Sequence, residues 1–293
     1  MKTTTVFTPT YNRAYIIKKL YESLLQQTNS DFEWLIVDDG STDNTKELIQ
    51  LFINDGKINI RYYYKINEGK HTAINMGVQK AKGELFFIVD SDDYIADNAI
   101  ERILYHYFFI KEDINFAGIC GLKAYSTGKK VGDEVIFNIL NCNSLDFRFK
   151  YKIKGDMAEV FRTEILREYK FPDIAGEKFC PEALVWNRIS QKYSLRYFYE
   201  KIYFCEYLSD GLTAQMVRLR IENVESSLLY YLELNNYNIP IWYKIRASIN
   251  YWRFAPYSKR DFNKKLKDIG LQKSIIALPL GILFFLKDYI KNG

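Results

Sequence analysis

The first 120 residues alternate between strand-like and helix-like segments, and this alternation constrains the fold more than any other feature. Apolar, β-favouring runs such as Phe32–Val37 and Leu85–Val89 alternate with segments whose apolar residues recur at helical spacing, such as Ala14–Gln27. Parallel strands need long crossover connections, and helices usually supply them. The sequence therefore predicts an α/β fold with a mostly parallel central sheet flanked by helices.

The same periodicities place the individual elements. The expected strands are Thr5–Thr8, Phe32–Val37, Ile58–Tyr64, Leu85–Val89 and Phe116–Cys120. The expected helices are Ala14–Gln27, one that starts near Thr42 or Asp43, Thr72–Lys82 and Asp97–Ile110. The second half is less regular, with a helix expected at Ala183–Lys192, a strand at Leu195–Tyr199 and a helical stretch at Val217–Leu234.

Three polar clusters follow the carboxyl ends of predicted strands. These clusters are Thr8–Arg13, Asp38–Asp43 and Asp90–Asp93. In open α/β sheets, ligands bind at this edge, in the crevice where the strand order switches. Together the clusters therefore predict a single site that is assembled from distant parts of the sequence.

The acidic run Asp90-Ser91-Asp92-Asp93 is the most visible of these clusters. Three carboxylates within four residues repel one another unless a cation neutralises them, and hard oxygen ligands suit Mg²⁺ or Mn²⁺. A divalent ion in this place can bridge a diphosphate and stabilise a leaving phosphate. An isolated run of this kind equally suits a solvated turn with a helix cap, but its position after a buried strand favours a metal site.

Two further features suit a nucleotide. The carboxylate of Asp39 can accept a hydrogen bond from N3–H of uracil, although paired aspartates before a helix, such as Asp38 and Asp39, are also a common capping arrangement. Lys70 and His71 follow a glycine at a probable helix start, where positive charge and backbone N–H groups can meet a phosphate. An ordinary core or surface histidine remains an equal alternative for His71.

The ordered motifs resemble glycosyltransferase family 2, whose members have the GT-A fold. The similar stretches are Val6–Arg13, Trp34–Asp43, Asn67–Gly83 and Phe86–Asp93. The resemblance implies an inverting transfer from a nucleotide-sugar donor, with UDP as the expected nucleotide, and assigns the metal, Mn²⁺ or Mg²⁺, to Asp92 and Asp93. It implies donor binding by Thr8, Pro9, Tyr11, Arg13, Asp39, Lys70, His71, Asp90, Ser91 and Asp92.

An inverting transfer also needs a general base within reach of the acceptor hydroxyl. The family places an acidic residue ahead of a helix in its second half, and Glu182, just after Pro181, fits this position, with Glu177 as the second choice. The commoner pattern is an Asp preceded by another acidic residue, from which this chain departs. Alternatively, Glu182 is an ordinary first-turn acid that is favourable to the helix dipole. Asp156 resembles an aspartate that contacts the acceptor.

The basic residues concentrate at the carboxyl-terminal end. Of the net charge of +5, the segment Lys244–Gly293 carries eleven Lys or Arg against three Asp or Glu, and the remaining chain has 30 against 33. Its apolar run, Ile275–Leu286, is shorter than the about 20 residues that span a bilayer. Interleaved aromatic and basic residues suit a membrane surface. A helix packed on the protein's own core is an equal alternative, and nothing in the first half supports nucleic-acid binding.

These observations predict a glycosyltransferase domain over residues 1–215, divided into a nucleotide-sugar-binding half (1–120) and an acceptor half (121–215), followed by a helical extension over 216–293. The acceptor is expected to be a saccharide or a lipid-linked saccharide of a surface polysaccharide. The four cysteines lack metal or disulfide spacing, and no signal peptide is recognisable before Val6, so a cytoplasmic location is expected, with peripheral attachment to the inner face of the membrane.

Two other functions fit parts of the sequence. A non-catalytic nucleotide-sugar-binding module would explain the departure from the family pattern at Pro181-Glu182. A sugar nucleotidyltransferase has a similar α/β layout, but it typically needs a glycine-rich loop after the first strand. The segment Thr8–Arg13 contains no glycine, which disfavours this second alternative.

Overall fold

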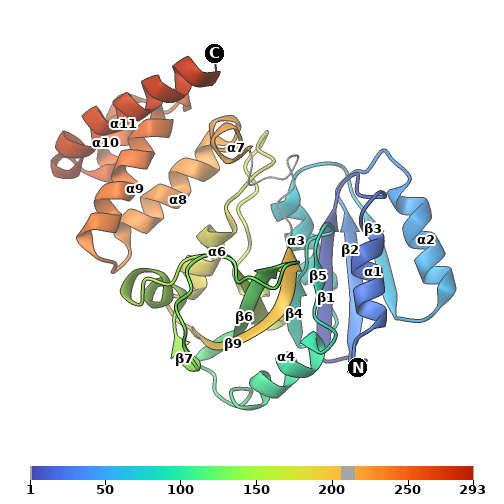
Figure 1. Ribbon diagram of the computed structural model, residues 1–293. Helices are drawn as coiled ribbons and strands as arrows, with labels where there is room; N and C mark the ends of the chain where they lie inside the picture. Colours follow the sequence, from blue (N-terminus) through green and yellow to red (C-terminus); the bar gives the residue numbers. More distant parts are fainter. Residues whose placement is uncertain (1, 206–214, 293) are drawn as a thin grey trace.

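The protein is described by a computed structural model, in which residues 2–205 and 215–292 are placed (Figure 1). In this part of the chain, a nine-stranded sheet has the order β3-β2-β1-β4-β8-β6-β9-β5, and β7 pairs with β9. The strands are β1 (Thr4–Thr10), β2 (Phe32–Asp38), β3 (Ile60–Tyr64), β4 (Leu85–Ile88), β5 (Tyr94–Ile95), β6 (Phe116–Tyr125), β7 (Ile139–Cys142), β8 (Met157–Arg162) and β9 (Ser194–Cys205).

The first four large strands form the parallel half of the sheet. β1 pairs in parallel with both β2 and β4, and β2 pairs in parallel with β3. The chain moves outward from β1 to β3 and then returns to the other side of β1 as β4. The strand order therefore switches between β1 and β4, which is where a crevice opens at the carboxyl edge of such a sheet.

The second half adds antiparallel pairs to this sheet. β8 is antiparallel to both β4 and β6, β5 and β7 are antiparallel to β9, and β6 and β9 are parallel. The predicted fold class is confirmed: a central sheet is flanked by helices and followed by carboxyl-terminal helices. The antiparallel strand β8 lies in the region where the sequence periodicity is irregular.

Helices cover both faces of the sheet, since alternate residues of each strand point to opposite sides. Val6, Trp34 and Phe87 face the core under α1 (Lys18–Leu25), α2 (Thr45–Asp55) and α4 (Ala99–Phe108). Phe7 and Phe86 face the core under α3 (Lys70–Lys80), α5 (Thr163–Glu168) and α6 (Glu182–Ile189). Strands buried on both faces explain the continuous apolar runs in the sequence.

The helix boundaries differ from the expected ones where polar groups bind the backbone. The first helix begins at Lys18 rather than Ala14, since residues 14–17 form a turn, in which the Ala14 N–H donates to the carboxylate of Asp43. α3 begins at Lys70, directly after Gly69. The expected stretch Val217–Leu234 is two helices, α7 (Met216–Glu222) and α8 (Val224–Asn236), which Asn223 separates.

The carboxyl-terminal helices form a separate core. Besides α8, this region contains α9 (Ile241–Phe254), α10 (Phe262–Ile269) and α11 (Leu271–Asn292). Figure 1 shows them gathered at one side of the molecule, next to α6 and away from α1 and α2. Arg253 of α9 pairs with Asp288 of α11 at 2.5 Å, and Gly281 lets the two helix backbones approach, because a Cβ there would lie 2.5 Å from Trp252 Cβ.

Among the described residues, no single helix combines the length and hydropathy needed to cross a bilayer. α10 and α11 up to Ile290 meet that criterion only when they are taken together, and they are bent by 113° at their junction.

Candidate functional site

Direct hydrogen bonds join the loops after β1 and β2. The Asn12 side-chain oxygen accepts from Thr42 N at 2.8 Å, and Asn12 N donates to Ser41 Oγ at 2.9 Å. Asp39 N donates to the carbonyl oxygen of Thr10 at 2.8 Å. Asn12 has a φ of 52°, a conformation that asparagine tolerates better than most residues. The structure therefore brings two of the three predicted clusters together at the carboxyl edge of the sheet.

Asp39 connects this edge to the start of α3. One of its carboxylate oxygens accepts from Lys65 Nζ at 2.8 Å and from Glu68 N at 3.0 Å, and the other accepts from Gly69 N at 2.8 Å. A carboxylate offers about four acceptor positions. Asp39 is nearly fully buried and uses three of these positions within the protein, so it fixes the segment that presents Lys70 and keeps about one position for a ligand.

The acidic run is a tight turn that Tyr203 of β9 holds in place. Asp93 N donates to the carbonyl oxygen of Asp90 at 3.1 Å. The Tyr203 hydroxyl accepts from Asp90 N at 3.0 Å and donates to Asp93 Oδ2 at 2.6 Å. Burial and the neighbouring Asp90 carboxylate raise the pKa of Asp93 to about 7 and also raise the pKa of Asp92. The carboxylates of the run therefore repel one another, and an added cation would reduce this repulsion.

Lys70 joins the acidic run to the predicted base. Its ammonium group lies 2.6 Å from Asp90 Oδ1 and 2.8 Å from Glu182 Oε1, and the three side chains are about one-third exposed or less. Burial would raise the pKa of Asp90, but the ammonium groups of Lys70 and Lys123 hold it below its usual value. Burial also opposes the charge of Lys70, but Asp90 and Glu182 raise its pKa above the usual value.

The space enclosed around these groups is small. A cavity of about 20 Å³ lies among Lys70, Asp90, Glu182 and their neighbours. One water molecule needs roughly 10–15 Å³ measured in this way. A sugar that binds between Asp90 and Glu182 must therefore displace side chains, and the flexible Lys70 arm, which closes the gap between them, is the group best able to move.

The two predicted base residues occupy different environments. Glu182 is the first residue of α6, its side chain is 36% exposed, and it faces the acidic run through Lys70. Glu177 instead accepts from Glu225 N at 2.6 Å and from Ser226 N at 2.8 Å, so its carboxylate caps the start of α8. This geometry favours Glu182 over Glu177 as the group that can meet an acceptor.

The other predicted donor-binding residues lie at the same edge, with different exposure. Thr8 is fully buried, and its hydroxyl accepts from Trp34 Nε1 at 2.9 Å, so its side chain belongs to the core. Tyr11 is 46% exposed beyond the end of β1. The charge of Arg13 acts on both Asp90 and Asp92, which places it near the acidic run. Pro9 and Ser91 are buried.

His71 and Asp156 lie outside the group that Lys70 connects. His71 is 2% exposed, and neither of its ring nitrogens has a hydrogen-bond partner among the described residues. Burial lowers its pKa, and the acidic groups that act on it include Asp173 and Asp39. Asp156 is exposed and directly precedes β8. Their predicted roles in diphosphate and acceptor binding remain predictions.

Sequence reasoning missed three side chains of this site. Tyr203 and Lys123 come from β9 and β6, and the Lys123 ammonium lies 4.1 Å from the centre of the Tyr203 ring. Glu159 of β8 lines the same small cavity, and burial raises its pKa to about 7. An acidic residue between the apolar residues of a strand, as in Met157–Phe161, is the local signal that could have indicated Glu159.

The acidic run fits a divalent ion in part. Among the described residues, no group of three or more His, Cys, Asp or Glu side chains is arranged to hold a metal. Mg²⁺ in phosphate-processing sites is commonly bound by one or two carboxylates and completed by phosphates of the substrate. The raised pKa values of Asp92 and Asp93 show that adding positive charge here is favourable, so these two carboxylates suit such a partial site.

Comparison with known proteins places the chain in a family. The profile of Glycosyl transferase family 2 matches residues 5–161, which is more than half of the chain. Glycosyltransferase GlyG of Streptococcus pneumoniae is 33% identical over 151 residues, which cover 51% of this chain and 43% of GlyG. An uncharacterized glycosyltransferase of Rickettsia felis is 43% identical over 96 residues, or 33% of this chain and 16% of that protein. The chain thus spans less than half the length of these relatives.

Solved structures share the fold at low sequence identity. Residues 1–349 of S. aureus TarS, in complex with UDP-GlcNAc, superpose with a TM-score of 0.68 at 18% identity, over 98% of this chain and 89% of that one. The mannosyltransferase PcManGT of Pyrobaculum calidifontis, in complex with GDP-Man and Mn²⁺, gives a TM-score of 0.56 at 16% identity, over 99% and 86%. From the sequence match and this shared fold together, the chain belongs to glycosyl transferase family 2.

Proposed function

We propose that this protein is an inverting, metal-dependent glycosyltransferase that moves a sugar from a UDP-linked donor to a saccharide or lipid-linked saccharide acceptor in surface polysaccharide synthesis. The observation that carries the proposal is the pair of contacts by which Lys70 joins Asp90 to Glu182. A donor-side carboxylate and a candidate base are thereby held on opposite sides of one ammonium group, at the switch point of the sheet.

The chemistry follows from this arrangement. Glu182 accepts the proton of the acceptor hydroxyl, whose oxygen forms a bond to the anomeric carbon of the donor sugar from the face opposite the diphosphate. The bond between the anomeric carbon and the diphosphate oxygen breaks, and its electron pair leaves with the nucleoside diphosphate. Lys70, once displaced from Glu182, remains near enough to Asp90 to offer its charge to the leaving phosphates.

Donor binding uses the other groups at the edge. Asp39 keeps one acceptor position for a base N–H, and Tyr11 and Arg13 follow Thr10, whose carbonyl oxygen accepts from Asp39 N. A divalent ion held by Asp92 and Asp93 would supply the charge that neutralises the leaving diphosphate. Complexes of the structural neighbours with UDP-GlcNAc, and with GDP-Man and Mn²⁺, support a nucleotide-sugar donor and a metal.

Donor hydrolysis tests the proposal without knowledge of the acceptor. A panel of UDP-linked and GDP-linked sugars is incubated with the protein, with and without Mn²⁺, and release of nucleoside diphosphate is measured. We expect one UDP-sugar to be hydrolysed in Mn²⁺ and not after chelation. Asp92→Asn should lower this rate at least about 100-fold, as expected when charge stabilisation of a transition state is lost.

The matched control is Asp97→Asn, because Asp97 lies just beyond the acidic run and is exposed. It should retain the rate. If the protein binds a nucleotide sugar but releases no diphosphate under any condition, the protein is a non-catalytic binding module instead.

We also infer that the carboxyl-terminal helices attach the protein to the cytoplasmic face of a membrane. In α11 the large apolar side chains face outward rather than toward the protein. The face packed on α9 contains small residues such as Ser274, Ala277 and Gly281, and the outer face is apolar. The exposed apolar residues of α11 are Leu271, Ile275, Ile276, Leu280, Leu283, Phe284, Leu286 and Ile290. Lys273 and Lys287 lie on α11 at either end of its apolar run, which suits an anionic lipid surface.

A further inference from the structure

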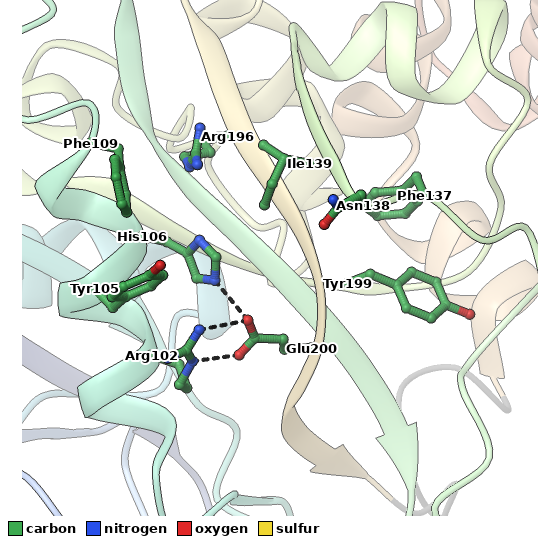
Figure 2. Close-up of a pocket in the computed structure, with 10 residues that line it drawn as sticks. All are labelled: Arg102, Tyr105, His106, Phe109, Phe137, Asn138, Ile139, Arg196, Tyr199 and Glu200. Carbon is green, nitrogen blue, oxygen red and sulfur yellow. Dashed lines mark hydrogen bonds and ion pairs between the residues drawn. The ribbon is translucent and has the colours of Figure 1, made fainter.

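A cavity near the sheet lies away from the acidic run. It has a volume of about 450 Å³, between α4 and the first half of β9, where β7 begins. This volume is in the range of small-molecule sites in proteins. Figure 2 shows its side chains: Arg102, Tyr105 and His106 from α4, Phe109 directly after α4, Arg196, Tyr199 and Glu200 from β9, and Phe137, Asn138 and Ile139 from the segment that leads into β7 and from its first residue.

At one part of the cavity wall, the carboxylate of Glu200 is hydrogen-bonded to two neighbouring side chains. Arg102 donates to both carboxylate oxygens of Glu200, at 2.6 Å and 2.8 Å, and His106 Nε2 lies 2.9 Å from Glu200 Oε1 (Figure 2). Because a carboxylate only accepts hydrogen bonds, Nε2 carries the proton. Burial, together with the charges of Arg102 and Arg196, outweighs the contact with Glu200 and lowers the pKa of His106. The ring is therefore neutral at neutral pH.

A neutral ring with its proton on Nε2 leaves Nδ1 as an acceptor. His106 is 3% exposed, and its Nδ1 has no partner among the described residues. The ring is fixed by stacking on Phe198, with ring centres 3.9 Å apart, so Nδ1 cannot turn toward another group. A buried acceptor without a partner lowers stability, and a ligand that donates a hydrogen bond to it would remove this cost.

Arg196, in contrast to His106, needs a hydrogen-bond acceptor from a ligand. Its Nε is buried without a hydrogen-bond partner, and no carboxylate among the described residues pairs with it. Its guanidinium lies 5.0 Å from the ring centre of Phe109, which holds it at the cavity wall. Arginine has only donors, so a ligand must present an acceptor to Arg196 and a donor to His106.

We propose that this cavity is a second saccharide-binding site, in which neighbouring hydroxyl groups of one sugar ring donate to His106 and accept from Arg196, while Tyr105 and Phe109 pack on the ring's C–H face. Hydroxyl groups both donate and accept, which a phosphate at neutral pH does not do equally well. Tyr105 and Phe109 are 49% and 54% exposed, and a sugar would pack on the parts of the two rings that the guanidinium groups of Arg102 and Arg196 leave uncovered. The site would hold a saccharide chain apart from the reacting sugar.

Binding of soluble oligosaccharides tests this site. Maltotetraose, N-acetylchitotetraose and tetragalacturonic acid serve as neutral, N-acetylated and acidic probes, followed by saturation-transfer NMR and calorimetry at up to about 10 mM, a range that detects weak binding. We expect at least one probe to bind. Phe109→Ala and Arg196→Met should each weaken binding about tenfold or more, as expected for loss of a packing surface or a charged hydrogen-bond donor. Tighter binding of the acidic probe would show that Arg196 meets a carboxylate.

Matched controls lie beside each substituted residue. Phe108 is 68% exposed on α4 and does not line the cavity, so Phe108→Ala should bind like the wild type. Lys201→Met serves in the same way for the charge on β9. All four variants should hydrolyse donor at the wild-type rate, because none changes a group assigned to donor chemistry.

Two results would overturn the site. One is that no probe binds to the wild-type protein; the other is that the cavity variants and the controls bind equally well. Either result with normal donor hydrolysis leaves the proposed transferase function intact. If the wild-type protein hydrolyses no donor but binds saccharide in a way that the cavity variants weaken, the saccharide site stands and the proposed transferase function falls.

Discussion

At the scale of single residues, the two candidate bases separate by what their carboxylates already bind. We expect Glu182→Gln to lower the rate of donor hydrolysis by about 100-fold or more, with the donor KM nearly unchanged, since general-base catalysis contributes about 10²–10⁴-fold. Glu177→Gln should leave this rate within a few-fold, because Glu177 caps α8. It should instead lower the stability of the protein by about 1 kcal/mol. Rates and melting temperatures of both variants check these outcomes.

The roles would be reversed if Glu177→Gln abolished turnover in a protein that melts like the wild type. A third outcome, in which neither variant changes the rate, assigns the proton to another group. Glu159 is then the next candidate, because it lines the same small cavity.

Glu159 also gives the protein a defined dependence of stability on pH. Burial raises its pKa from 4.5 to about 7. The unfolded chain therefore loses this proton at lower pH than the folded protein, and the contribution of Glu159 to stability falls between about pH 4.5 and about pH 7. Glu159→Gln should remove this fall and gain on the order of 1–3 kcal/mol relative to the wild type above pH 7, at 1.36 kcal/mol per pKa unit.

Urea unfolding at a series of pH values measures this difference. The control is Glu164→Gln, at an exposed position of α5 close along the chain. This substitution should change the free energy of unfolding only slightly, and by the same amount at every pH. Parallel pH profiles for Glu159→Gln and the wild type would show that the Arg148 and Lys123 charges already neutralise the burial of Glu159.

At the scale of elements, the parallel half of the sheet could be predicted because each strand, turn and helix in it has a recognisable local sequence pattern. A buried strand, a polar turn and an amphipathic helix recur there, and the polar turns necessarily meet at one edge. Asp90 and Asp39 were predicted as site residues in this way, and both lie at this edge. Strand β8 was not, because its antiparallel pairing with β4 and β6 depends on distant residues rather than on a repeated local pattern.

The site residues that sequence reasoning missed share this cause. Tyr203 and Lys123 reach the acidic run only because β9 and β6 pair with each other and the sheet continues across β8. Their contacts join residues more than 100 positions apart in the case of Tyr203 and Asp93. No local spacing encodes such a contact. The predicted base, Glu182, was instead assigned from the family resemblance and its expected place at a helix start, and its role stays a prediction.

The start of α8 positions the segment that leads to Glu182. The Asn223 side-chain oxygen accepts from Lys178 N at 2.6 Å and from Phe179 N at 3.0 Å. We expect Asn223→Ala to lower the rate of donor hydrolysis about tenfold or more without changing donor affinity, because the two N–H groups lose their partner and the segment shifts. Donor titration and initial rates measure the two quantities separately.

The control for this variant is Asn236→Ala, at the exposed end of the same helix. It should change neither quantity. A stability loss in Asn223→Ala with an unchanged rate at a temperature where the protein is folded would show that Glu182 is placed without help from α8.

At the scale of the whole molecule, charge divides the chain into two regions. Residues 244–293 carry eleven basic and three acidic residues, whereas the rest of the chain has 30 basic and 33 acidic residues. The basic excess thus coincides with the helices that expose the apolar face of α11. A lipid surface that is both apolar inside and anionic outside satisfies both properties, and a sugar acceptor anchored in that surface would be presented to a protein docked there.

Vesicle binding tests this division. We expect the protein to co-sediment with vesicles that contain phosphatidylglycerol, to bind neutral vesicles less, and to be released when salt shortens the Debye length from about 10 Å at 0.1 M to about 3 Å at 1 M. Replacing Ile276 and Leu283 together by Ser should weaken binding about tenfold or more, since both are exposed apolar side chains of α11 that insertion would bury.

The matched control is Leu51→Ser on α2, because Leu51 is 64% exposed, close to the 62% of Leu283, and lies in the other region. It should bind vesicles like the wild type. Donor hydrolysis should be unchanged in all these variants, since α11 contributes no group to the site. The Ile276 and Leu283 substitutions could instead convert a dimer to a monomer in sedimentation experiments and leave vesicle binding intact. In that case a second copy of the chain covers the apolar face of α11, and this face does not bind the membrane.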